Sequence, residues 1–164
     1  ILAPRRQERV EQVRRELAKY HLSWQNWTDL STAARSSNVI VLDTMGELAE
    51  LYSIATVAFV GNSLFSPGGG HSLIEPAAQG VPILHGPYIP NCSVHADQLG
   101  RLGAARVVRN ARDIANQVNH IIGYPQESRT ATLRAQQWIH SQRGASDKLA
   151  ELVLSNLHSG TSAA

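Results

Sequence analysis

Short apolar runs alternate along this chain with segments in which apolar residues recur every three or four positions. The runs at 39–42, 55–60, 81–84 and 105–108 are strand-sized, and the run at 39–42 is unbroken and mostly β-branched. Such runs are typical of strands buried in a parallel sheet. A shorter candidate strand spans 22–27. Strands that alternate with helical segments predict an α/β fold, a Rossmann-like parallel sheet flanked by helices.

Helical periodicity marks the segments between these strands. Val10, Val13 and Leu17 share one face of a predicted helix over 7–20, and charged residues fill its other positions. Further helices are predicted over 45–52, 73–78, 94–102, 113–122 and 128–157, the last with a break at Gly144.

Two of these helices carry N-cap signals. Thr44 and Glu47 have the spacing of a capping box for the helix over 45–52. Ser72 is a candidate N-cap for the short helix that follows it, and Gly80 is placed to end that helix.

The size and composition predict one soluble globular domain over 1–164, with a helical tail from about 125. A net charge of +2 is too small to indicate nucleic-acid binding. No apolar run is long enough to cross a bilayer, and the single cysteine excludes an internal disulfide. The chain begins without methionine, on residues that resemble the end of a strand, so we expect it to be part of a longer protein.

Three consecutive glycines at 68–70 lie between a predicted strand and a predicted helix. Ligands bind at this place in open parallel sheets. Glycine amides beside a helix start favour phosphate, although a flexible surface loop is the simpler alternative. Glu75 follows one turn into the helix. Its carboxylate could accept two hydrogen bonds from a ribose diol, or it could be an ordinary solvated residue.

Several nucleotide and hydrolase motifs are missing. The chain has no G-x-x-x-x-G-K-[ST], and Leu73 stands where G-x-G-x-x-G would require glycine. Neither Ser63 nor Ser72 lies in a G-x-S-x-G sequence. These absences argue against a Walker-type triphosphatase, a typical dinucleotide fold and an α/β-hydrolase.

Metal ligation is also not supported by the sequence. Cys92 and His95 have tolerable ligand spacing, but no second pair of ligands completes a four-ligand set. We therefore predict no metal and no other cofactor, and we interpret Cys92 as a partly buried thiol.

Arginines cluster just after the start of the chain. Arg5 is nearest to the end of the first apolar segment, where it could clamp a phosphate or carboxylate. Arg6 and Arg9 are better interpreted as a solvated helix face paired with nearby glutamates.

Taken in order, DTMGEL at 43–48, GGH-x-x-x-EP at 69–76 and GPY at 86–88 resemble the C-terminal half of bacterial 3-deoxy-D-manno-octulosonic acid (Kdo) transferases. That family makes the inner core of lipopolysaccharide. The resemblance begins at APRRQER over 3–9, is strong over roughly 1–110 and is only generic in the helical tail.

The resemblance implies a GT-B glycosyltransferase, with two Rossmann-like domains and an active site between them. This chain would be the donor-binding domain, without the N-terminal acceptor domain. The donor would be CMP-Kdo and the acceptor a lipid A precursor, in an inverting transfer. The general base would lie in the missing domain, so no catalytic residue is predicted here. The full enzyme would sit on the cytoplasmic face of the inner membrane, held by its N-terminal part, whereas this fragment would be soluble.

The resemblance also implies donor-binding residues. Arg5 would contact the anionic groups of the donor, and Glu75 would bind its ribose. The other expected contacts are Met45, Gly46 and Glu47 beside the cytidine, Gly61, Asn62 and Ser63 facing the sugar or phosphate, Gly69, Gly70, His71 and Ser72 on the phosphate side, and Gly86, Pro87 and Tyr88 bordering the base.

The chain departs from the family pattern at several positions. Arg6 and Gln7 replace histidine and proline, Gly61-Asn62 replaces a glycine pair, and Ser72 replaces asparagine. Because serine has a shorter reach than asparagine, Ser72 leaves a divergent sugar specificity open. Two alternatives also remain: a UDP-sugar-dependent GT-B transferase or epimerase, and a non-catalytic module that binds a nucleotide or a protein.

Overall fold

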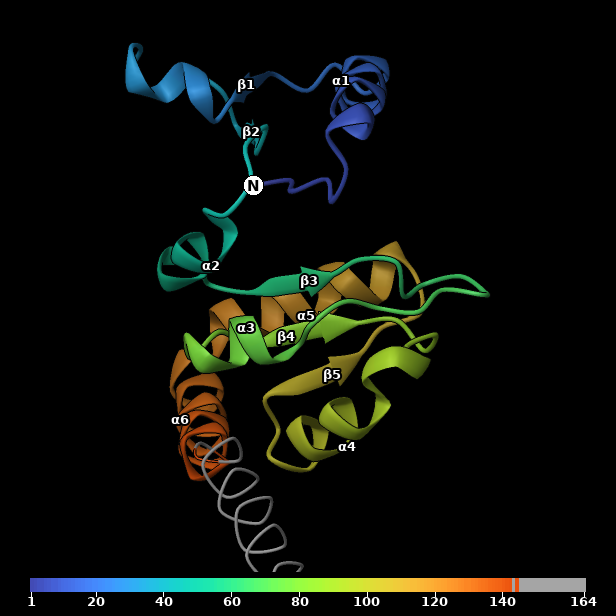
Figure 1. Cartoon of the computed structure of the whole chain (residues 1–164), viewed down its shortest axis with the longest axis vertical. Helices are drawn as coiled ribbons and strands as arrows, with labels where there is room; N and C mark the ends of the chain where they lie inside the picture. The colour runs from blue at the N-terminus through green and yellow to red at the C-terminus, as the bar shows by residue number, and fades with distance from the viewer. Residues whose placement is uncertain (143, 145–164) are drawn as a thin grey trace, which may run out of the picture. The chain divides into compact units, whose positions relative to one another are not determined.

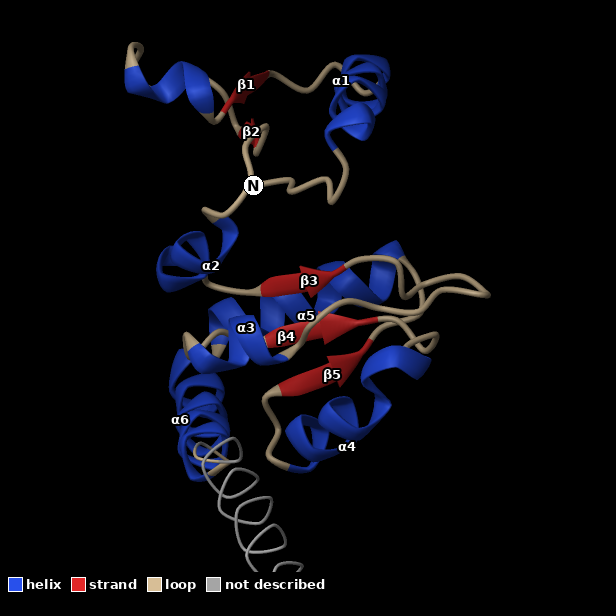
Figure 2. Ribbon diagram, in the orientation of Figure 1, coloured by secondary structure: helices blue, strands red, loops and turns tan. Residues whose placement is uncertain are grey.

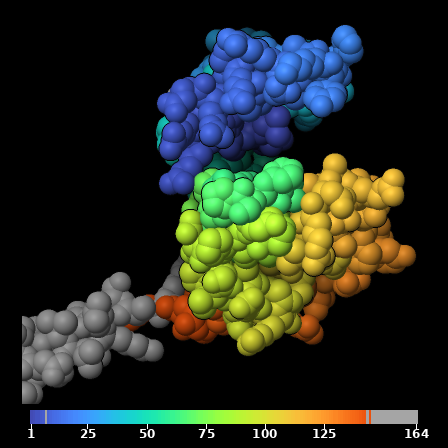
Figure 3. Space-filling view, turned by 90° about the vertical axis from the view of Figure 1, so that its right-hand side faces the viewer, coloured from blue at the N-terminus to red at the C-terminus, as the bar shows by residue number. Residues whose placement is uncertain are grey.

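Parallel strands flanked by helices build the protein, shown here as a computed structural model that describes residues 1–142 and 144 (Figures 1 and 2). The predicted α/β class is confirmed. The chain divides into two compact units, Ile1–Leu51 and a second that begins at Tyr52. Figure 3 is a space-filling view in which most of the first unit is blue and the described part of the second unit runs from green to red. Each unit is described by itself.

The first unit holds a two-stranded parallel sheet and an amphipathic helix. Leu2 adds a parallel bridge to the second strand, because its amide donates to Ile40 and its carbonyl accepts from Leu42, both at 2.8 Å. Val10 and Leu17 of the helix pack against Val41 of the sheet. The elements are η1 Gln7–Arg9, α1 Val10–Lys19, β1 Trp24–Asn26, η2 Thr28–Ser31, β2 Val39–Val41 and α2 Leu48–Leu51.

The predicted capping box at Thr44 and Glu47 is wrong. Helix α2 begins only at Leu48. Gly46 has a φ of +100°, a left-handed conformation that cannot continue a right-handed helix. The Thr44 hydroxyl has no hydrogen-bond partner in the described part of the chain. The segment 44–47 is therefore a turn that precedes the helix.

The second unit contains a three-stranded parallel sheet in the order β3-β4-β5. The middle strand is buried on both faces, and Ile83 and Leu84 are each 0% exposed. The elements are η3 Tyr52–Ile54, β3 Ala58–Val60, α3 Ile74–Ala78, β4 Ile83–His85, η4 Pro90–Cys92, α4 Ser93–Arg101, β5 Ala105–Val107, α5 Ala111–Gly123 and α6 Pro125–Ser141.

Helices cover both faces of this sheet (Figure 2). Ile83 faces a core with Leu99 of α4 and Ala135 of α6, to which α3 also contributes. Leu84, the next residue along the strand, faces a second core with Ile121 of α5. Because neighbouring strand residues point to opposite faces, one apolar strand supports two cores. The result is a three-layer arrangement of helices, sheet and helix.

Two further helix starts in the second unit differ from the predictions. Ser72 does not cap α3, whose N-cap position is Leu73 without a side-chain hydrogen bond, although Gly80 ends the helix with a φ of +74° as predicted. Helix α6 begins at Pro125, earlier than expected, directly after α5 ends. The predicted continuation past Gly144 lies outside the described residues. No helix in the described part of the chain is long and apolar enough to cross a membrane.

Candidate functional site

The candidate site lies at the carboxyl edge of the β3-β4-β5 sheet. Parallel strands end on the same side, so the segments after Val60, His85 and Val107 leave the sheet together (Figure 1). This edge is where ligands bind in open α/β sheets. Ten of the predicted site residues, in the ranges 61–63, 69–72 and 86–88, lie in the segments that leave β3 and β4.

A buried serine ties the ends of β3 and β4 together. Ser63 is 1% exposed. Its hydroxyl donates to the Val60 carbonyl at 2.6 Å and accepts from the Gly86 amide at 2.9 Å. Its own carbonyl accepts from the Tyr88 amide at 2.9 Å. Ser63 therefore holds two turns in register, and its buried hydroxyl already makes two hydrogen bonds within the protein.

The glycine loop packs onto the segment that follows β4. Gly68, Gly69 and Gly70 all have positive φ angles, of +60°, +130° and +72°. The Gly69 amide donates to the Tyr88 carbonyl at 3.0 Å, and the Gly70 amide donates to the Asn62 carbonyl at 2.9 Å. Both glycines are buried. The expectation that these amides are bare is therefore wrong, because protein carbonyls already accept from them.

Close packing explains why this loop needs glycine. A Cβ on Gly69 would lie 2.9 Å from the Asn91 amide nitrogen, and one on Gly70 would lie 2.8 Å from Ile89 Cγ2. Real Cβ atoms do not approach neighbours this closely, and the left-handed backbone is an independent reason for glycine. The glycines allow the loop and the turn to pack closely together.

Polar groups beside the loop remain accessible. The exposed Asn62 has a φ of +56°, and its side-chain amide donates to the Gly68 carbonyl at 2.9 Å. The backbone amides of His71 and Ser72 make no hydrogen bond within the described chain, and Ser72 is exposed. A mostly apolar cavity of about 230 Å³ adjoins Asn62 and is lined by Phe59, Asn62, Ser63, Leu64 and Phe65.

Glu75 is an exposed residue in the first turn of α3. Among the described residues, no side chain or amide hydrogen bonds or forms an ion pair with its carboxylate. Burial, followed by the negative charge of Glu75, raises the pKa of the nearby Tyr52 hydroxyl. The carboxylate is therefore an unpaired acceptor, open to solvent.

One cation at this edge was missed by the sequence reasoning. Residues 52–100 contain no lysine or arginine. Arg109 follows the end of β5, where the Val108 amide donates to the His85 carbonyl at 2.8 Å, beside Gly86. Its side chain is exposed, while its amide donates to Asp113 at 2.9 Å. Arg5 was singled out because it directly follows a strand-like segment. Arg109 has the same kind of position, so the same signal could have identified it from the sequence.

His85 and Cys92, two side chains near this edge, are buried. His85 is 4% exposed, and its Nδ1–H donates to the Gly86 carbonyl at 2.8 Å. Cys92 is buried, and burial raises the pKa of its thiol, which disfavours the nucleophilic thiolate. Among the residues that the structure describes, no three His, Cys, Asp or Glu side chains gather as metal ligands.

The remaining predicted residues belong to the first unit. Arg5 is exposed, and Met45 is 72% exposed in the turn that Gly46 forms. Glu47 is half-buried, and its Oε2 atom has no hydrogen-bond partner among the described residues. Arg6 pairs with Glu8 at 3.4 Å on the surface, which fits the solvated interpretation.

The chain is similar to several curated transferases. It is 32% identical over 148 residues to a 3-deoxy-D-manno-octulosonic acid transferase of Chlamydophila psittaci, covering 90% of this chain and 34% of that protein. The enzyme of the same name from Aquifex aeolicus is 32% identical over 90 residues, 55% of this chain and 25% of that protein. A bifunctional glycosyltransferase/methyltransferase of Fusobacterium nucleatum is 30% identical, covering 74% of this chain and 19% of that protein. No protein-family model matches the chain.

A solved structure agrees with these relatives. The C-terminal CMP-Kdo binding domain of WaaA from Acinetobacter baumannii superposes with a TM-score of 0.76 and 28% identity, covering 85% of this chain and 72% of that one. The fold and its loop-lined edge thus define a Rossmann-like domain of the glycosyltransferase class. The chain belongs to the Kdo transferase family and corresponds to its C-terminal half. It spans about a third of the length of the psittaci relative, at 34%.

Substitution of Gly86, which packs directly against Ser63, should cause a large loss of stability. In Gly86→Ala the new methyl group would collide with the Ser63 carbonyl, which the Tyr88 amide holds in place. We expect the free energy of unfolding to fall by about 3 kcal/mol, as for overpacking in a rigid core. Urea unfolding followed by circular dichroism measures this change.

Gly61→Ala is the matched control, because Gly61 ends the neighbouring strand and a Cβ there meets nothing within 4 Å. Its unfolding free energy should stay within about 1 kcal/mol of wild type. Equal effects of the two substitutions would contradict the packing described here.

Proposed function

We propose that this chain is the donor-binding part of a glycosyltransferase that moves Kdo from CMP-Kdo to a lipid A precursor with inversion. The observation that carries the proposal is the similarity to a CMP-Kdo binding domain over 85% of the chain at a TM-score of 0.76. The Kdo transferases among its relatives support the same activity.

The ribose of the donor is assigned to Glu75. Its carboxylate is exposed and unpaired within the described structure, so binding would not have to break an existing ion pair. A carboxylate accepts from two hydroxyl groups at once, which suits the vicinal diol of a ribose. Its place on α3, directly after the glycine loop, supports this role.

The phosphate of the donor is assigned to groups other than the glycine amides. The free amides of His71 and Ser72 and the guanidinium of Arg109 are the donors available at this edge. Arg5 is proposed for the same anion on the strength of the family resemblance. Charge placed beside the leaving phosphate lowers the barrier to departure of CMP. The turn at Pro87 and Tyr88 is proposed to border the cytidine. For Met45, Gly46 and Glu47, contact with the cytidine stays a prediction from the family resemblance.

Other components of the reaction are proposed to lie outside this chain. Deprotonation of the acceptor hydroxyl requires a general base, and we assign it to a carboxylate of an N-terminal domain. That domain is also proposed to bind the lipid acceptor and to hold the enzyme at the cytoplasmic face of the inner membrane. The chain alone should therefore bind CMP and not catalyse transfer.

Replacement of Glu75 tests the ribose assignment. Glu75→Gln removes the charge that strengthens hydrogen bonds from the ribose hydroxyls, so we expect affinity for CMP to fall by about tenfold. Wild type should bind CMP more tightly than 2′-deoxy-CMP, and the variant should lose most of this preference. Isothermal titration calorimetry with both nucleotides measures the two effects.

Asp97→Asn is the control, since Asp97 is an exposed carboxylate on α4 and the change in net charge is the same. Unchanged discrimination between the two nucleotides in Glu75→Gln would reject the ribose role. A preference for UDP over CMP in wild type would instead favour a UDP-sugar donor.

Replacement of Arg109 tests the phosphate assignment. Arg109→Gln should weaken CMP binding by about fivefold, as expected for one solvent-exposed charge contact, and leave cytidine binding unchanged. The effect should shrink at high salt because exposed charges are screened. Titrations of CMP and cytidine at low and high ionic strength measure both.

Arg112→Gln provides the control, because Arg112 is exposed on the first turn of α5 and removes the same charge. If both variants weaken CMP equally, the effect reflects overall charge and Arg109 has no specific role.

A further inference from the structure

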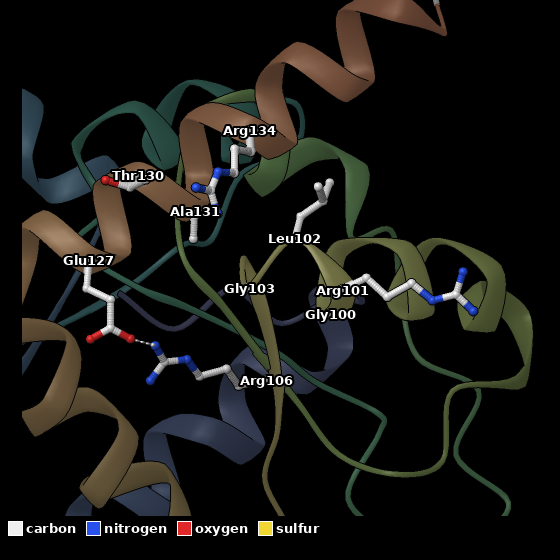
Figure 4. Close-up of a pocket in the computed structure, with 9 residues that line it drawn as sticks. All are labelled: Gly100, Arg101, Leu102, Gly103, Arg106, Glu127, Thr130, Ala131 and Arg134. Atoms are coloured by element: carbon white, nitrogen blue, oxygen red, sulfur yellow. Dashed lines mark hydrogen bonds and ion pairs between the residues drawn. The ribbon is translucent and has the colours of Figure 1, made fainter.

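A second cavity lies at the opposite end of the sheet from the candidate donor site. It measures about 450 Å³ and opens between the turn before β5 and the first half of α6 (Figure 4). Gly103 and Ala131 line it where these two segments meet, since a Cβ on Gly103 would lie 3.4 Å from the Ala131 Cβ. Because it adjoins the amino end of β5, it is separate from the loops that follow β3 and β4.

Arginines dominate the charge around this cavity. Arg101, Arg106 and Arg134 line it together with a single carboxylate, Glu127. Arg106 donates to Glu127 at 3.2 Å and to the Gln117 side chain at 2.8 Å, which fixes its guanidinium and neutralises the acid.

The other two arginines remain uncompensated. Arg101 and Arg134 are exposed, and neither forms an ion pair with any residue that the structure describes. In Figure 4 Arg134 extends from α6 toward Ala131 at the cavity, whereas Arg101 points away from it. Arg134 is therefore the cation best placed to contact a ligand.

The surrounding sequence has the same charge. Residues 101–142 contain six arginines and two acids, a net charge of +4, whereas residues 52–100 contain two acids and no lysine or arginine. Arg101, Arg106, Arg129 and Arg134 belong to the segments that form the cavity, whereas Arg109 and Arg112 follow the carboxyl end of β5.

Two backbone carbonyls near the end of α4 already accept hydrogen bonds. The Leu102 amide donates to the Gln98 carbonyl at 3.2 Å, and the Gly103 amide donates to the Gly100 carbonyl at 2.9 Å. Carbonyls that already accept a hydrogen bond repel an anion less than bare ones.

We propose that this cavity binds the phosphate group of a phosphorylated ligand. Arg134 would be the principal contact, and the guanidinium of Arg106, held by Glu127 and Gln117, would form part of the cavity wall. Guanidinium groups match the geometry of phosphate and can bind it through two hydrogen bonds. The ligand is either a soluble phosphomonoester or the headgroup of an anionic lipid, and the experiment separates these sources.

The test uses the complete 164-residue chain, labelled with ¹⁵N, and titrations of inorganic phosphate and glycerol 3-phosphate. Binding at the cavity should shift the amide signals of Gly100 and Gly103. The amides of Gly69 and Gly70 report on the donor edge, so the two sites are read separately. A second arm measures sedimentation with phosphatidylglycerol vesicles, against phosphatidylcholine vesicles.

Arg134→Gln should weaken binding by about tenfold, the equivalent of one charge-assisted hydrogen bond. Arg129→Gln is the matched control, an exposed arginine on the same helix that does not line the cavity. Shifts with soluble phosphates that only Arg134→Gln weakens support a soluble ligand. Vesicle binding that only Arg134→Gln weakens supports a lipid headgroup. Absence of both, or equal loss in the two variants, overturns the proposal.

Discussion

The hydrogen bonds of one buried serine organise the carboxyl edge of the second unit. The Ser63 hydroxyl joins the carbonyl at the end of β3 to the amide that follows β4, so two turns from distant parts of the sequence share one position. No Cβ fits at Gly86 against the Ser63 carbonyl. The turn at Tyr88 is held by the same serine, and the glycine loop then packs on that turn. The geometry of the whole edge thus depends on this junction.

Because of this constraint, several backbone amides at the edge are already hydrogen-bonded within the protein, whereas some side chains remain exposed. The Gly69 and Gly70 amides are directed toward protein carbonyls, so they contribute rigidity to the loop. The packing leaves other polar groups exposed at this edge, among them the side chains of Glu75 and Arg109. A loop fixed by internal hydrogen bonds has little entropy to lose on binding, which favours a preorganised site.

Sequence patterns predicted the strands well because a buried parallel strand requires an apolar run, as at Val39–Val41 and at Ile83 and Leu84 of β4. The capping box at Thr44 failed because Gly46 adopts a left-handed conformation that the spacing rule ignores. The partners of the glycine amides were beyond prediction for another reason. Gly69 bonds to Tyr88, and only the folded sheet brings those residues together.

The distribution of charge along the second unit has a consequence for an anionic ligand. Residues 52–100 provide loops and two acidic residues but no lysine or arginine. A phosphate at this edge would therefore obtain its cation from Arg109, after the last strand, or from outside the unit. Arg101, Arg106 and Arg134 line the cavity near the amino end of β5, the opposite end of the sheet from Arg109, so they cannot serve the same phosphate. The proposed donor site and the proposed cavity site therefore draw on different arginines.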